Sequence, residues 1–445
     1  MLAILCCVLA FAATFWAAKR SLGAGVLAVA AVGYAYGILR ANMLQAASHF
    51  IFDASLAGLY LAYGSRFFDS QARTSALRSW TVLLMAWPCL VCLLPFQPLM
   101  VSIVGLRGNV FFLPILLIGS QLRNKDLREF TFGMALLNLV ALGFGILEYF
   151  RGIEPFFPRS AVTSIMYASG DVAGGFYRIP SLFTSAHAYA GTMTFTIPFL
   201  FGAWTQDDQP KLQKLILLLG MGAAMGGVLL ASTRLYFVIA LFFVVIATLS
   251  GNVSARKRIL WIAAILIVGA VAMTNERFQR FKSLGDSESV MERIAGSVNR
   301  SFLEVLFDYP MGNGLGGGGT SMPYFLQGQI RNPVGIESEY ARILAEQGFI
   351  GLLLWIGFVL WCTIRRTPFL KNRWLPSRRL IWYWYTLSFI TSTIGVGMLT
   401  AIPGTFMLLL AIGWTVVEPL PEVAVRPHGH LRPGGVPRRR PVYAG

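Results

Sequence analysis

A short stretch from Gly335 to Trp355 concentrates charged residues at the start of an otherwise apolar segment. It consists of GIESEYARILAEQGFIGLLLW and includes Glu339, Arg342 and Glu346. Ionisable side chains are costly among apolar residues, so those that occur there commonly serve a function. Carboxylates can accept a proton from an attacking group, and arginine can hold an anion. The stretch is therefore the first candidate for chemistry.

The charges in this stretch divide into two groups by helical position. On a helix Glu339, Arg342 and Glu346 share one face, and we predict that they neutralise one another. Glu337 has no neighbouring cation in the sequence and aligns instead with Tyr340, which we place in the substrate-binding set. Two interpretations of Glu337 are open. It is either a partner of the helix dipole or a general base that is ionised at neutral pH.

Two arginines adjoin apolar segments elsewhere in the chain. Arg178 precedes SLFTSAHAYAG, which contains His187, and Arg234 closes the sequence LLASTR. A guanidinium group binds phosphate through two N–H groups, so we predict a phosphate-binding role for both arginines, with His187 beside Arg178. The alternatives are that each arginine only extends to water from a helix end, and that His187 is a packing residue.

The composition indicates that membrane-spanning helices must position these residues. Of the 445 residues, 56% are hydrophobic and only 13% are charged, and the mean hydropathy is +0.63. Soluble domains carry about a quarter charged residues. Apolar runs near 20 residues match the thickness of a hydrocarbon core. We predict an all-α, polytopic bundle with spans at 2–18, 21–39, 44–64, 80–97, 109–121, 130–150, 185–204, 212–231, 234–250, 259–273, 339–363, 380–396 and 400–418. The fifth span is short enough to be re-entrant.

The formal net charge of +17 is explained by the distribution of cations between the two sides of a membrane. Roughly two thirds of the 37 lysines and arginines fall on alternate loops of one side, which the positive-inside rule makes cytoplasmic. Basicity is thus a topology signal, and nucleic acid is not an expected partner. The N-terminus is predicted outside and the C-terminus inside, with the first span retained because no cation precedes it.

This topology divides the chain into three regions. Residues 1–150 form N-terminal spans, 151–418 form the transmembrane region that holds the candidate residues, and 419–445 form a basic, disordered cytoplasmic tail. The middle region has two long outer loops, 151–184 and 274–338. The second contains Arg293, Arg300 and Arg331, which we predict to guide an anionic substrate.

Three other patterns carry less information about chemistry. Cys89 and Cys92 form a CxxC inside an apolar segment, so a metal or redox role is not expected. The glycine run from Met311 to Gly319 has no preceding strand and no following Lys-Ser/Thr, which excludes a nucleotide loop. It is either a linker or a turn that lets the backbone approach a ligand. Residues 274–310 have the spacing of an amphipathic helix, which lies either on the membrane interface or against the bundle.

Four features, in this order, resemble the bacterial O-antigen polymerase and O-antigen ligase family. They are Arg178 with its following segment, the Ser-Thr-Arg at 232–234, the Pro and glycine-rich segment at 302–318, and the helix at 338–355. Together they cover about residues 170 to 360. In ligases of this family a His stands eleven residues before the first Gly of a G-x-x-G step, and in this chain that position holds Glu337. The difference favours a polymerase.

The resemblance implies a metal-independent, inverting glycosyl transfer, without a cofactor, at the outer face of the bacterial inner membrane. The donor would be a glycan on undecaprenyl diphosphate, and the acceptor a sugar hydroxyl on a second lipid-linked unit. Arg178 and Arg234 would stabilise the departing diphosphate, and Glu337 would accept the proton. Flippase and chain-length regulator proteins are the implied protein partners. The alternatives are a ligase that moves finished glycan onto lipid A core or protein, and a transporter, although no internal repeat is evident.

Overall fold

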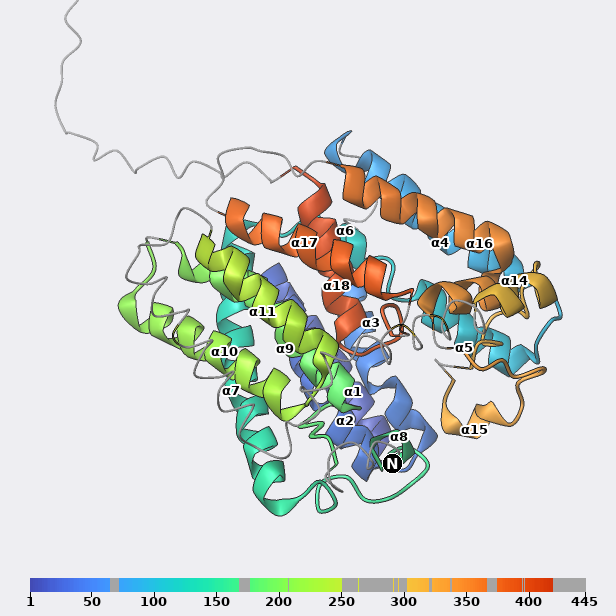
Figure 1. Ribbon diagram of the computed structural model, residues 1–445, viewed down its shortest axis with the longest axis horizontal. Helices are drawn as coiled ribbons and strands as arrows, with labels where there is room; N and C mark the ends of the chain where they lie inside the picture. The colour runs from blue at the N-terminus through green and yellow to red at the C-terminus, as the bar shows by residue number, and fades with distance from the viewer. Residues whose placement is uncertain are drawn as a thin grey trace, which may run out of the picture.

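The computed structural model describes residues 1–64, 72–167, 177–206, 208–249, 263, 291, 295, 302–319, 322–336, 338–365, 374–393, 395 and 397–418. These residues form helices joined by turns and contain no strand. The prediction of an all-α helical bundle is confirmed (Figure 1). The predicted span at 259–273 lies outside the described residues, apart from residue 263.

Long apolar helices make up most of the bundle, because a helix satisfies its own backbone polar groups where no water is available. In chain order they are α1 (Leu2–Arg20), α2 (Leu22–Asn42), α3 (Ile51–Tyr63), α4 (Ser75–Val91), α5 (Leu99–Val110), α7 (Asn124–Arg151), α9 (Ala186–Trp204), α10 (Lys211–Leu230), α11 (Arg234–Leu249), α16 (Glu339–Ile364), α17 (Leu375–Thr391) and α18 (Gly404–Val416). The short elements are η1 (Ala46–Phe50), η3 (Ala72–Thr74), α6 (Ile115–Gly119), α8 (Ser164–Tyr167), α14 (Glu304–Asp308) and α15 (Tyr324–Gln327).

The helices have the length and the surface of membrane spans. Within the described residues, six helical segments are long and apolar enough to cross a bilayer. Large apolar side chains such as Leu5, Leu9 and Trp16 are exposed along α1. A face of this kind suits lipid rather than water. The chain is therefore a membrane protein.

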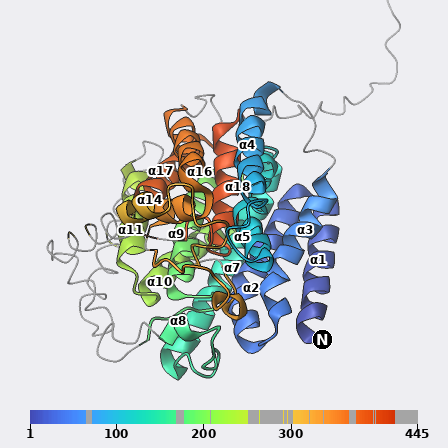
Figure 2. The same cartoon turned by 90° about the vertical axis from the view of Figure 1, so that its right-hand side faces the viewer.

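The loops fall into two sets at opposite ends of the bundle. One end, called here the N-terminal end, contains Met1, whose amino group contacts Gln45 at 3.4 Å, and Asn42, which donates to the Phe156 carbonyl at 2.9 Å. At the opposite end Arg128 pairs with Asp208 at 2.6 Å. Figure 2 places the N-terminus and α8 together at the bottom of the molecule. The described loops thus lie at two opposite ends, as a bundle of spans requires, and the outward orientation of the N-terminal end stays a prediction.

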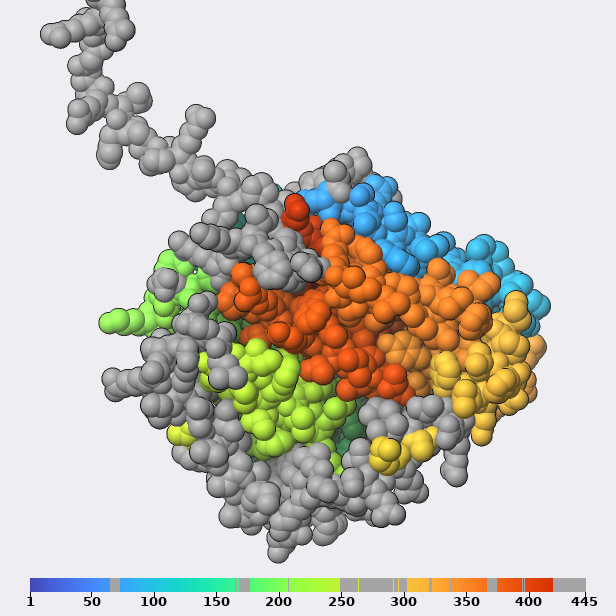
Figure 3. All heavy atoms as spheres, turned by 45° about the horizontal axis from the view of Figure 1, so that its top comes forward, coloured from blue at the N-terminus to red at the C-terminus, as the bar shows by residue number. Residues whose placement is uncertain are grey.

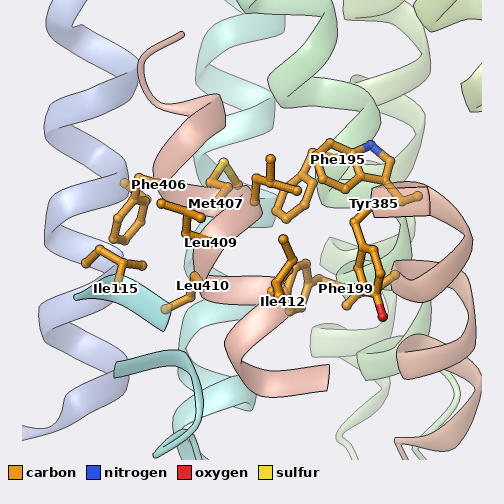
Figure 4. Close-up of a cluster of buried hydrophobic side chains, with 14 of the residues drawn as sticks. Ile115, Phe195, Phe199, Tyr385, Phe406, Met407, Leu409, Leu410 and Ile412 are labelled. Atoms are coloured by element: carbon orange, nitrogen blue, oxygen red, sulfur yellow. The ribbon is translucent and has the colours of Figure 1, made fainter. Parts of the chain in front are cut away.

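The core of the bundle surrounds α18, which is buried along its whole length. Figure 4 shows Phe406 and Leu410 of α18 near Ile115 of α6, while Ile412 faces Phe199 of α9. Helices α6 and α18 approach very closely. A Cβ at Gly413 would lie 2.0 Å from the Leu116 carbonyl oxygen, so only glycine fits there. Close apolar packing thus stabilises the centre of the bundle around α18.

Three predicted helix boundaries were wrong for local reasons. Helix α4 ends at Val91 rather than continuing to 97, where a turn leads to Pro98. The next crossing then begins at Leu99 and reaches Gly119 through α5 and α6, so the fifth span is not short. Helix α17 starts at Leu375, about one turn before the predicted boundary. Figure 3 shows α4, α16, α17 and α11 side by side on one face.

Helix α16 is not the continuous helix that its apolar sequence predicts. Gly348 has φ 68° and ψ −175°, which breaks the helical path after its third turn. A Cβ at this position would lie 2.6 Å from the Met311 carbonyl oxygen. A positive φ and a close backbone neighbour both require glycine here.

Gly348→Ala should therefore destabilise the protein by about 1–3 kcal/mol, because the strained backbone and the clash cannot both be relieved. Gly222→Ala in α10 is the matched control, since its new Cβ meets no atom within 4 Å and alanine favours helix by about 0.5–1 kcal/mol. Thermal unfolding in detergent should show a lower midpoint for the first variant only. Equal midpoints would contradict the predicted strain.

Candidate functional site

The charged face of α16 is a completely buried ion-pair network. Arg342 donates from Nε to Glu339 Oε1 at 2.8 Å and from Nη1 to Glu346 Oε2 at 2.7 Å. All three side chains have no solvent exposure. The predicted pairing of these three charged residues is confirmed. Two carboxylates and one guanidinium leave one formal negative charge among the three.

Helix α5 completes this network with a residue that the sequence did not indicate. Asn109 donates to Glu346 Oε2 at 2.7 Å and accepts from Arg342 at 3.2 Å and from Gln347 at 2.9 Å. Glu339 Oε2 in turn accepts the Gly397 N–H at 2.8 Å. The network therefore joins α16 to α5 and to the segment after α17.

The glycine run lies against the break in α16 as a buried, tightly turned loop. Asn313 donates its backbone N–H to the Ala345 carbonyl at 2.5 Å, and Phe349 donates to the Pro310 carbonyl at 3.0 Å. A Cβ at Gly105 of α5 would lie 2.3 Å from the Gly316 nitrogen. Four glycines of the run adopt positive φ. The run is thus neither an extended linker nor an open ligand loop. It is a compact turn that fills the space between α5 and α16.

The start of α16 packs against the segment that follows α17. Ser338 caps the helix by accepting the Ala341 N–H at 3.5 Å, as its type predicts. Tyr340 donates its hydroxyl to the Phe389 carbonyl at 3.0 Å. Glu337 itself lies outside the described residues, as do Arg293 and Arg300. The prediction that Glu337 is a base therefore stays untested by the described residues.

Arg331 is held near the glycine loop rather than near the other predicted cations. Its backbone N–H donates to Gln97 at 2.9 Å, and its Nη1 donates to the Pro95 carbonyl at 3.4 Å. The Arg331 carbonyl also accepts from Asn313 at 3.1 Å. The residue is exposed, so its guanidinium remains accessible from outside.

Arg178 and His187 are brought together, as the sequence predicts. Nη1 of Arg178 lies 3.2 Å from Nε2 of His187. The Nε group of Arg178 is buried and has no partner within the described residues. His187 is exposed on the first turn of α9. A guanidinium with an unused donor beside an imidazole can bind an anion such as phosphate.

Arg234 begins α11 at the same end of the bundle. It follows Ser232, whose φ of 50° makes the sharp turn between α10 and α11. Its Nε is also buried without a partner in the described part of the chain. A Cβ at Gly145 would meet both Leu230 and Ile179, so the end of α10 lies beside the loop that carries Arg178. Helix packing thus brings the Arg178 and Arg234 segments to the same end of the bundle. The described contacts do not join the two guanidinium groups directly.

A buried carboxyl group supports the Arg178 loop. Glu148 of α7 is fully buried, and its Oε2 accepts the backbone N–H of Ser181 at 2.8 Å. Ser181 adopts φ 53° and donates its hydroxyl to the Ala141 carbonyl at 2.7 Å. The other oxygen of Glu148 has no partner among the described residues. A carboxyl that holds a strained turn three residues after Arg178 fixes the path of that loop.

The segment ahead of Arg178 has its own polar cluster. Arg159 pairs with Glu154 at 2.8 Å and donates to the Tyr177 hydroxyl at 3.2 Å. The Glu154 carboxylate raises the pKa of Arg159, and burial raises the pKa of Tyr167, whose ring lies 4.8 Å from the Arg159 guanidinium. Tyr177 is therefore engaged with Arg159 as well as adjacent to Arg178.

Comparison with known proteins adds no assignment for this arrangement. No protein-family model matches the chain, and no curated protein matches its sequence. Within the described residues, no group of three or more His, Cys, Asp or Glu side chains could hold a metal ion. The family resemblance stated above therefore remains a prediction.

Arg342→Met should destabilise the protein by about 3–5 kcal/mol, because it leaves Glu339 and Glu346 buried without a counter-charge. Arg159→Met is the control, since its ion pair is 65% and 59% exposed and solvent screens it. Thermal unfolding in detergent should separate the two variants clearly. A similar small effect in both would mean that the buried network is not a major constraint.

Glu148→Leu should speed hydrogen exchange at the Ser181 amide by about tenfold or more, because that N–H loses a buried acceptor. Glu148→Gln keeps a carbonyl oxygen at this place and should preserve most of the protection. Glu154→Leu, which removes an exposed carboxyl at the same end, is the control. Unchanged exchange in Glu148→Leu would show that other contacts hold the turn.

Proposed function

We propose that this protein polymerises oligosaccharide repeat units carried on undecaprenyl diphosphate, at the outer face of the bacterial inner membrane. The product would be a surface polysaccharide or exopolysaccharide. The catalytic region would lie at the N-terminal end of the bundle, which faces the periplasm in the predicted topology. The Arg178–His187 pair, with its unused guanidinium donor, is the observation that carries the proposal.

The reaction needs few groups from the protein. The acceptor hydroxyl attacks the anomeric carbon of the donor sugar, and a new C–O bond forms as the bond to the diphosphate breaks. The bonding electron pair leaves on the diphosphate oxygen, where Arg178 and Arg234 would stabilise the developing charge. Glu337 would accept the proton of the attacking hydroxyl. Attack from the side opposite the leaving group inverts the anomeric configuration.

The described geometry is compatible with these roles. Both arginine segments lie at one end of the bundle, and each guanidinium retains a buried Nε without a partner in the described residues. Helix α16, which Glu337 precedes, begins at the same end, where Glu339 donates its backbone N–H to the Ser392 carbonyl at 3.0 Å. The fixed start of α16 would give Glu337 a defined position relative to the substrate.

Arg178→Ala and Glu337→Ala should each abolish long polymer, because one removes stabilisation of the leaving group and the other removes the proton acceptor. The measurement is glycan length on gels of whole-cell polysaccharide, with protein level followed by immunoblot. Arg151→Ala removes an exposed cation at the same end of the bundle and should leave polymer length unchanged. Normal polymer in both site variants would refute the site.

Two further comparisons distinguish the reaction class. Deletion of the gene should leave single repeats on the lipid carrier, whereas loss of a ligase would leave finished polymer there. Glu337→His should retain partial activity, because imidazole can also act as a general base. Purified protein with a synthetic lipid-linked repeat should form product, and a transporter would form none.

A further inference from the structure

A cluster of two arginines and a histidine lies at the N-terminal end of the bundle, on α2, α5 and η1, with Asp53 of α3 beside it. Arg107 of α5 forms a two-pronged ion pair with Asp53 of α3, with Nε to Oδ1 at 2.7 Å and Nη2 to Oδ2 at 2.5 Å. The same Nη2 lies 3.5 Å from the His49 carbonyl oxygen. Tyr36 donates its hydroxyl to that carbonyl at 3.0 Å. These contacts bring three separate helices and η1 to one point.

The charge of this cluster is not balanced by the described residues around it. Arg107 and Asp53 neutralise each other, and Arg40 adds one positive charge near them. The positive charges of both arginines act on the His49 imidazole, and Arg40 also acts on Tyr36. A net positive charge in a largely buried position favours an anion as its partner.

Unused donors identify where such an anion would bind. His49 is only 4% exposed, and its Nε2 has no hydrogen-bond partner within the described residues. Nε of Arg40 is likewise buried and unpartnered there. Buried nitrogen groups of this kind are costly unless a ligand or water satisfies them. The hydrogen bonds of Arg107 to Asp53 and His49 use Nε and Nη2.

The cluster remains accessible from the surface. The Arg107 and Asp53 side chains are 20% and 12% exposed, so the ion pair borders an opening rather than a closed core. Two aromatic rings of α15 cover the imidazole, with Tyr324 and Phe325 centred 5.7 and 5.6 Å from His49. An anion can thus reach Arg107 from the surface, and the two aromatic rings shield the imidazole of His49 from bulk water.

We propose that Arg40, His49 and Arg107 form a second phosphate-binding site, separate from the Arg178 segment. Guanidinium groups suit phosphate because their N–H groups match its oxygens. Asp53 holds the Arg107 fork in place and leaves Nη1 for the ligand. In terms of the proposed function, on which this role depends, a polymerase handles two lipid diphosphates at once. The second site would hold the acceptor, while Arg178 and Arg234 hold the donor.

The test measures how many diphosphates bind to the full-length protein in detergent. Titration calorimetry with geranylgeranyl diphosphate should give two sites per chain for the wild type. Arg40→Gln and His49→Gln should each lower the affinity of one site at least about tenfold, because each variant loses one charge-assisted hydrogen bond to the ligand. Arg178→Ala should remove the other site. Arg151→Gln, which alters an exposed arginine at the same end, should retain both.

A parallel titration with inorganic pyrophosphate distinguishes the source of the phosphate. Equal affinity for both probes at this site would support recognition of a free phosphate group, and stronger binding of the lipid probe would support a lipid head group. If Arg40→Gln does not fold, Arg40→Lys and His49→Gln provide the comparison. Arg40→Lys keeps the positive charge, so this variant should bind the diphosphate more tightly than His49→Gln does.

The possible failures are distinguishable. Two sites that persist in both Arg40→Gln and His49→Gln would overturn the second site and leave the proposed function intact. If the wild type has a single site and Arg178→Ala loses it, the second site is likewise overturned and the proposed function stays intact. Two sites that both persist in Arg178→Ala would instead overturn the Arg178 assignment.

Discussion

The buried guanidinium of Arg342 is the constraint on which the packing around α16 depends. Burying three ionised groups is tolerable only if every charge is paired at short distance. Arg342 meets Glu339 and Glu346 at 2.8 and 2.7 Å because they lie three residues before it and four residues after it. That spacing exists only if this part of the chain is helical. The ion pairs and the first turns of α16 therefore stabilise each other.

The same network decides what surrounds α16. Asn109 has to approach Glu346, so α5 must lie against this face, and the glycine loop then has space only for bare backbone between the two helices. The break at Gly348 follows from this arrangement, because the Phe349 N–H donates to the Pro310 carbonyl rather than to a carbonyl of its own helix. A polar interaction thus fixes the arrangement of segments that the apolar packing alone would leave free to slide.

The sequence predicted those features that depend on neighbours along the chain. Run length indicated the spans, and the spacing of Glu339, Arg342 and Glu346 predicted their pairing. The approach of His187 to Arg178 also agreed with the structure. Asn109 and Glu148 escaped notice because their partners lie far away in sequence: Glu346 is 237 residues from Asn109, and Ser181 is 33 residues from Glu148. Neither partner follows from helical periodicity.

Helix α5 shows what the boundary error at Leu99 hid from the sequence. Residues two apart on a helix point about 200° from one another, so Arg107 and Asn109 face opposite sides of α5. Asn109 joins the net negative network of α16, while Arg107 joins the net positive cluster of α2 and α3. An interpretation of 109–121 as a short re-entrant segment leaves Arg107 in a loop and hides its relation to Asn109. With the helix begun at Leu99, α5 becomes the element that places Arg107 in one charged cluster and Asn109 in the other, on opposite faces of a single helix.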